Sequence, residues 1–151
     1  MTDTRHRSAD ERRADIQASA AALGITEAYI STLVETFYAR VRVDPELGPI
    51  FNNAIGHEWD VHLEKIKAFW SSVALNTGRY DGRPVPAHKK HPEIQEQHFG
   101  IWLGLFEQTL RDTAPTEGAA AYFLERAQRI AQSLRMALFG IDLFEGPRPT
   151  P

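Results

Sequence analysis

Apolar residues recur every three or four positions along four long stretches of the chain, a spacing typical of amphipathic helices. We expect helices over about 26–43, 57–77, 93–112 and 117–139, with a weaker, alanine-rich helix over 9–23. The inward face of the first long helix is expected to consist of Ile30, Leu33, Val34, Phe37, Tyr38 and Val41. No stretch alternates apolar and polar residues as a strand would, so the pattern predicts an all-α fold.

Residues that stop helices separate these stretches. Pro45 and Pro115 each follow a helical pattern, and the residue before a proline avoids helical angles. The apolar residues 47–51 contain a glycine and a proline, and we expect a turning corner there. Residues 78–92 are rich in proline and glycine and allow only a short helix around 84–91.

Composition limits the possible functions. With 151 residues the chain is long enough for one domain with a substantial core. The net charge is −3 and no basic stripe appears, which argues against a nucleic-acid partner. The absence of cysteine excludes disulfides, thiolate chemistry and cysteine-ligated metal centres. No apolar run reaches the length of a membrane span and the N-terminus is polar, so we expect a cytoplasmic protein without a membrane partner.

Histidine spacing first raises the question of a metal. His88 and His91 lie three residues apart, so on a helix they could share one ion. Two ligands are too few for a typical site, and no Glu-x-x-His motif elsewhere completes a di-iron bundle. A non-haem metal site is therefore disfavoured.

Three polar groups lie on the apolar faces of predicted helices: Tyr38, His62 and Trp102. Each alone is most simply a core residue whose polar atom finds a partner. Together they indicate a pocket that needs hydrogen-bond donors in an otherwise dry place. Haem explains this need, because one imidazole binds its iron and tyrosine, indole or imidazole donors stabilise bound dioxygen. The alternative is a non-haem, all-helical protein-interaction module in which the aromatic stripes are only core.

Several segments of the chain match one family at compatible spacings. They cover 37–44, 47–55, 59–62 with 69–70, 78–84 leading to His88, and 98–109. Over about 33–138 the chain resembles the truncated haemoglobins, most closely group III, and its lack of a Gly-Gly pair fits that group.

The resemblance implies a role for each candidate residue. His88 corresponds to the proximal iron ligand, with His91 as its competitor, while Tyr38, His62 and Trp102 correspond to the distal residues. Lys65 is placed to reach a haem propionate, although an ordinary surface charge explains it nearly as well. The residues expected to line the ring are Phe37, Phe51, Ile66, Phe69 and Ile101.

The resemblance also implies an architecture and a function. We expect a truncated globin, a two-over-two helical sandwich around haem b, over 25–140, with a partly helical or mobile extension over 1–24 and a flexible tail over 141–151. The expected ligands are dioxygen, nitric oxide, carbon monoxide or cyanide. Dioxygen binding or transport is the expected role. Nitric-oxide-detoxifying or peroxidase-like chemistry stays open and would need an unidentified reductase.

Overall fold

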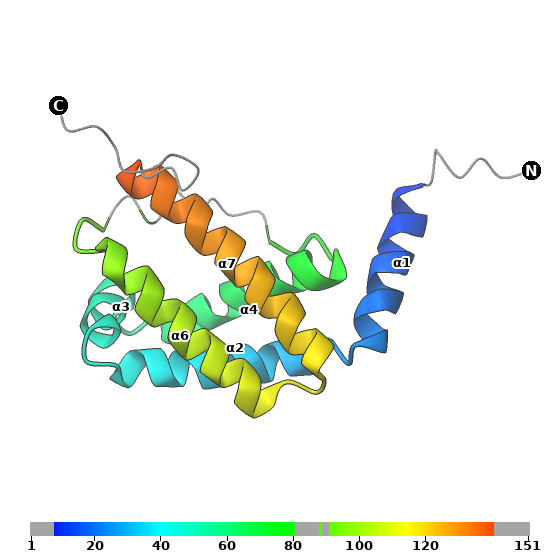
Figure 1. The fold of residues 1–151 in the computed structure, drawn as a ribbon, viewed down its shortest axis with the longest axis horizontal. Coiled ribbons are helices and arrows are strands. Elements are labelled where there is room, and N and C mark those ends of the chain that lie inside the picture. Colours follow the sequence, from blue (N-terminus) through cyan, green and yellow to red (C-terminus); the bar gives the residue numbers. More distant parts are fainter. Residues whose placement is uncertain (1–7, 81–87, 89–90, 141–151) are drawn as a thin grey trace, which may run out of the picture.

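The computed structural model describes residues 8–80, 88 and 91–140, and over these ranges the ordered elements are helices without any strand (Figure 1). The predicted tail over 141–151 and most of the short helix expected around 84–91 lie outside the described residues, although His88 itself is helical. No helix in the described ranges is long and apolar enough to cross a membrane. The helices are α1 (Ala9–Ala22), α2 (Glu27–Val43), α3 (Leu47–Ile55), α4 (Trp59–Leu75), α6 (Glu96–Thr113) and α7 (Glu117–Phe139).

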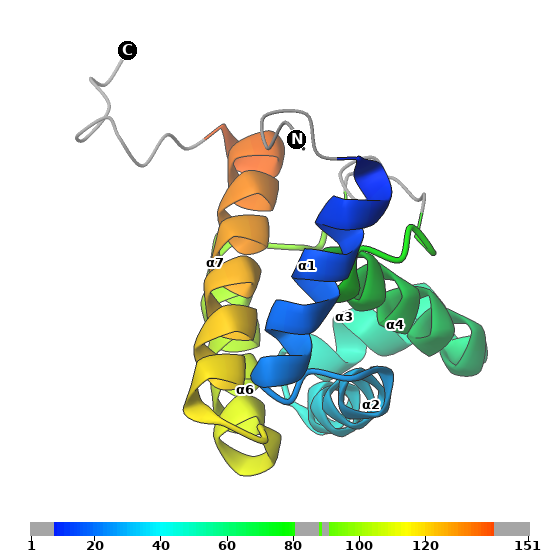
Figure 2. The same cartoon turned by 90° about the vertical axis from the view of Figure 1, so that its right-hand side faces the viewer.

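The long helices form two layers. Helix α2 packs against α4, and α6 packs against α7. In Figure 2, which looks nearly along α2, the α6–α7 pair lies on one side and α4 on the other. Contacts between α2 and α6 join the two pairs. This arrangement confirms the predicted two-over-two fold.

Local sequence signals place most helix ends where they were predicted. Thr26 and Thr116 each accept a backbone N–H bond through the side chain and so begin α2 and α7. All six residues predicted for the inward face of α2 are buried. Helix α6 starts at Glu96, later than predicted, because the His98 ring accepts the Gln95 backbone N–H at 2.8 Å and caps the helix there.

Residues 47–55 form helix α3, so the prediction of a simple corner over 47–51 was wrong. The Asp44 carboxylate accepts the backbone N–H of Leu47 at 2.8 Å and organises the turn that starts the helix. Pro49 lies in the first turn, where a helix needs no backbone donor. Gly48 is required, because a Cβ there would lie 2.7 Å from the Arg42 carbonyl oxygen.

Helix α1 lies at the edge of the bundle and contacts α4 (Figure 1). Its side chains reach the end of α4, where Gln17 Nε2 donates to the Leu75 carbonyl at 2.9 Å and Arg13 Nε donates to the Asn76 carbonyl at 3.0 Å. These bonds satisfy carbonyl groups that the end of a helix leaves without partners. Helix α1 therefore stabilises the C-terminal end of α4.

Candidate functional site

Tyr38 and Trp102 meet between α2 and α6, although 64 positions separate them in the sequence (102 − 38). Tyr38 is only 7% exposed, and burial raises the pKa of its hydroxyl to about 12, while the hydrogen bond with Trp102 acts in the opposite direction. An indole nitrogen can only donate, so Trp102 donates to the Tyr38 oxygen. The hydrogen of Tyr38 is then left for another acceptor.

Aromatic contacts fix the orientation of Trp102. Its ring stacks on Phe106 with centroids 5.3 Å apart and planes 6° apart. It also meets Phe37 edge to face, with centroids 5.3 Å apart and an interplanar angle of 88°. Because Phe37 comes from α2 and Phe106 from α6, the indole is held by both helices that form the pair.

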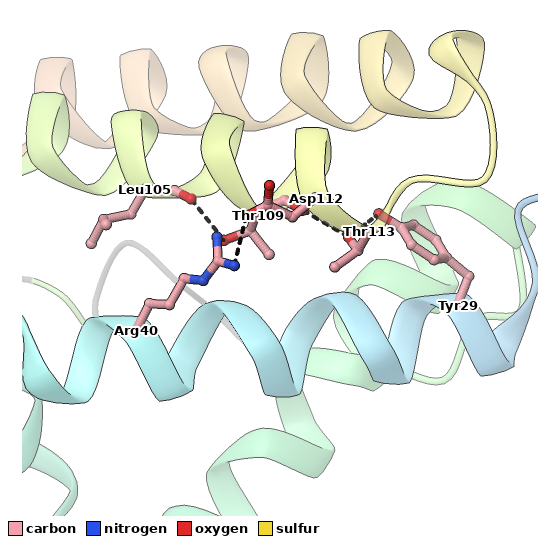
Figure 3. A network of polar contacts seen from close by, with 6 residues as sticks. All are labelled: Tyr29, Arg40, Leu105, Thr109, Asp112 and Thr113. Atoms are coloured by element: carbon pink, nitrogen blue, oxygen red, sulfur yellow. Dashed lines mark hydrogen bonds and ion pairs between the residues drawn. The ribbon is translucent and has the colours of Figure 1, made fainter.

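Polar contacts join α2 and α6 further along the same interface (Figure 3). Arg40 donates to the hydroxyl of Thr109 at 3.3 Å and to the carboxylate of Asp112 at 2.7 Å. The hydroxyls of Tyr29 and Thr113 lie 3.0 Å apart nearer the start of α2. Thr109 is fully buried, so its bond from a charged donor is made in a low-dielectric setting. These contacts fix the relative placement of the two helices that carry Tyr38 and Trp102.

His62 lies half-buried on α4. Its imidazole pKa is lowered mainly by burial, and the positive charges of Lys65 and His88 lower it further. The neutral ring is thus favoured near neutral pH. The influence of His88 also shows that the two imidazoles lie within electrostatic reach of each other.

His88 and His91, the two candidates for an iron ligand, differ in their surroundings. Both line a cavity of about 400 Å³. His91 Nδ1 lies 3.5 Å from a carboxylate oxygen of Glu93, whereas His88 acts on the pKa of His62. Of the two, His88 is the one whose charge lowers the pKa of His62. The cavity is lined by His88, His91, Pro92, Ile94, Ala137, Leu138 and Phe139.

The side chains expected to line a haem are large and apolar, and they come from several helices. Phe37, from α2, is almost fully buried. The others are only half-buried, which leaves apolar surface for a flat ring to cover. They are Phe51 from α3, Ile66 and Phe69 from α4, and Ile101 from α6.

The donor set also fits a haem better than a bare metal ion. Within the described ranges, no group of three or more histidine, cysteine, aspartate or glutamate side chains gathers as a metal site. A porphyrin brings its own nitrogen ligands, so a single imidazole from the protein completes the attachment. Lys65 is exposed on α4, and its positive charge contributes to the lowered pKa of His62.

Trp59, Asn52 and Arg40 were given no functional role by the sequence pattern. The structure shows the Trp59 indole donating to the Asn52 side-chain oxygen at 3.2 Å, and Arg40 bridging two helices. An N–H group on an apolar stripe was a signal that Trp59 needs a partner. Asn52 and Arg40 gave no such signal, because a polar residue on a helix surface is ordinary.

The chain is similar to known proteins in both sequence and structure. The chain is 42% identical over 118 residues to the Group 3 truncated hemoglobin ctb of Campylobacter jejuni, which covers 76% of this chain and 92% of that protein. It also resembles the crystal structure of group III truncated hemoglobin from Campylobacter jejuni, with a TM-score of 0.73 and 40% identity over 82% of this chain and 96% of that one. No protein-family model matches the chain.

Proposed function

The chain belongs to the group III truncated haemoglobins, and we propose on that basis that it binds haem b through His88 and holds diatomic molecules beside Tyr38, Trp102 and His62. One observation carries the proposal. The buried Tyr38 hydroxyl is oriented by Trp102, while His62, nearby on α4, lies within electrostatic reach of His88. A ligand that binds between His62 and His88 would therefore meet hydrogen-bond donors only on its His62 side.

Different side chains of the protein would contribute in different ways to holding such a ligand. When bound, haem supplies one open coordination position and electron density that a diatomic molecule withdraws. Tyr38 remains protonated because its pKa is about 12, so its hydroxyl donates at any physiological pH. Trp102 donates to the Tyr38 oxygen and points the hydroxyl hydrogen away from itself. The apolar side chains of Phe37 and Phe51 keep water from competing for this hydrogen.

Such donors favour some diatomic molecules over others. Dioxygen accumulates negative charge and gains most from a donated hydrogen bond, whereas carbon monoxide gains little. We therefore assign slow dioxygen release as the main property of the site, with nitric oxide, carbon monoxide and cyanide as further ligands. Sustained oxidation of nitric oxide or reduction of peroxide would draw electrons from a separate reductase.

Haem reconstitution tests this function directly. We expect the protein to take up one haem, to show a Soret band and to lose it in His88→Ala but keep it in the control His91→Ala. A pyridine haemochrome spectrum identifies the haem as type b. A protein that stays colourless with haem in excess would overturn the proposal and favour the protein-interaction module. Loss of the band in His91→Ala alone would move the ligand to His91.

A further inference from the structure

Trp59 connects three helices at the N-terminal end of α4. It is the first residue of α4 and is only 5% exposed. Its Nε1 donates to Oδ1 of Asn52 on α3 at 3.2 Å. The guanidinium carbon of Arg42, near the end of α2, lies 4.7 Å from the centre of the indole. The ring is therefore fixed by a hydrogen bond and a cation–π contact.

Asn52 is itself held in one orientation. Its Nδ2 donates to the Arg42 backbone carbonyl at 3.1 Å, so its Oδ1 faces the indole. Arg42 thus contacts Trp59 directly through its guanidinium group and indirectly through Asn52. A buried tryptophan needs one partner for its N–H. Here that partner is itself oriented by the Arg42 carbonyl, and the Arg42 guanidinium adds a second contact to the ring.

The same indole contacts two of the residues assigned to the ligand pocket. Its centroid lies 6.1 Å from the Tyr38 ring at 52° and 6.1 Å from the His62 ring at 89°. Residues three apart on a helix share one face, so Trp59 stands one turn before His62 on α4. Among the described residues, the His62 ring has no hydrogen-bond partner, which leaves the edge-to-face contact with Trp59 as its orienting interaction.

We propose that Trp59 is a positioning residue: fixed by Asn52 and Arg42, it holds the His62 imidazole on the pocket side of α4, next to Tyr38. The part of this inference that concerns the ligand rests on the proposed function. The part that concerns the His62 ring does not, because the contacts exist in the protein chain alone. Ligand release would then depend on residues that never touch the ligand.

The test begins with Trp59→Phe, which keeps an aromatic ring beside His62 but removes the N–H bonded to Asn52. Losing a neutral hydrogen bond changes the balance between two ring orientations by about fivefold. We expect the His62 imidazole resonances in the haem-free protein to shift or split. Asn52→Leu should reproduce this effect, and Asn52→Asp, which keeps an acceptor for the indole but loses the bond to the Arg42 carbonyl, should shift the resonances less than Asn52→Leu does.

A double-mutant comparison separates action through His62 from general loosening. In the haem-loaded protein, Trp59→Phe should change the dioxygen dissociation rate about fivefold, and the same substitution in a His62→Leu background should leave that rate unchanged. Tyr122→Phe is the control, because it removes one hydrogen bond to α4 at its far end, the bond to the Val73 carbonyl. It should leave the His62 resonances as they are.

The His62 resonances and the dioxygen dissociation rates test the inference separately. Unchanged His62 resonances in both Trp59→Phe and Asn52→Leu would overturn the positioning role. An equal rate change in the His62→Leu background would show that Trp59 acts through Tyr38 instead and would also overturn it. If the chain takes up no haem, the proposed function fails while the imidazole resonances still decide this inference. If Trp59→Phe does not fold, the comparison of Asn52→Leu with Asn52→Asp decides the question, because Asn52 is exposed.

Discussion

Trp102 is expected to slow dioxygen release through Tyr38 and not by contacting the ligand itself. Its indole N–H is already donated to the Tyr38 oxygen. The informative perturbation is therefore a cycle of four proteins: wild type, Tyr38→Phe, Trp102→Phe and the double variant. Phenylalanine keeps an aromatic ring at each position, so the stacking with Phe106 and the contacts with Phe37 lose only part of their area.

The structure sets the expected size of each effect. Tyr38 would donate to a ligand that carries partial negative charge, and such a bond is worth roughly 1.5–3 kcal/mol. At 1.36 kcal/mol for each factor of ten, Tyr38→Phe should speed dioxygen dissociation by about 10- to 150-fold. The bond from Trp102 to Tyr38 joins two neutral groups and is worth about 0.5–1.5 kcal/mol, so Trp102→Phe should speed dissociation by about 2- to 12-fold.

Stopped-flow displacement of dioxygen by carbon monoxide measures all four rates. If Trp102 acts through Tyr38, its substitution has no further effect once the tyrosine hydroxyl is gone, and the double variant dissociates at the rate of Tyr38→Phe. The reasoning is refuted if Trp102→Phe multiplies the rate by the same factor in both backgrounds. That result would mean that the indole leaves Tyr38 and donates to the ligand.

Three further predictions follow from burial and local packing. The pKa of Tyr38 is about 12 when folded and near 10 when unfolded, so its contribution to stability is present below pH 10 and is lost as pH rises toward 12. In urea denaturation, wild type should therefore lose about 2 kcal/mol more than Tyr38→Phe over that window, and parallel curves would contradict this. Gly100 and Gly104 lie within α6 with nothing within 4 Å of an added Cβ, so each change to alanine should raise the free energy of unfolding by about 0.5–1 kcal/mol, and a lower thermal midpoint would show an unseen constraint. Lys65→Met should speed haem loss to an acceptor globin by up to about fivefold, whereas Lys67→Met should not, since Lys67 is already paired with glutamates at 3.2 and 3.4 Å; equal rates for both would remove Lys65 from the haem site.

Local signals explain which parts of the fold the sequence could predict. The apolar spacing of α2 acts within a few residues, and the structure agrees with the inward face predicted there. Helix α3 was missed because glycine and proline normally indicate a turn. Here the Asp44 carboxylate accepts the backbone N–H of Leu47 in the turn that starts the helix, and Pro49 lies in the first turn, where a proline is tolerated. The late start of α6 was missed because His98 acts as a cap, a role more often filled by glutamate or glutamine.

In the candidate site, too, some residues carry a signal in the sequence and others do not. Tyr38, His62 and Trp102 stand out in the sequence because a polar atom on an apolar face needs a partner, and the resemblance to a known family then assigned them roles. The residues that orient them do not stand out. Asn52 and Arg40 are polar side chains at helix surfaces, and their importance comes only from what they reach across a helix crossing: Asn52 reaches Trp59, and Arg40 reaches Thr109.

The rate of ligand release depends on both the type and the alignment of the hydrogen-bond donors. The donors are fixed in type, since removing a hydroxyl or an indole N–H removes a hydrogen bond outright. On the positioning role proposed above, their alignment depends on residues such as Asn52 and Arg40, which lie at helix surfaces. A hydrogen bond weakens steeply as its angle departs from linear, so a small rotation of His62 or Tyr38 changes dissociation without changing the donor set. Two truncated globins with identical pocket residues can therefore release dioxygen at different rates, and the cause is to be sought at the contacts between α2, α3 and α6 as well as in the pocket.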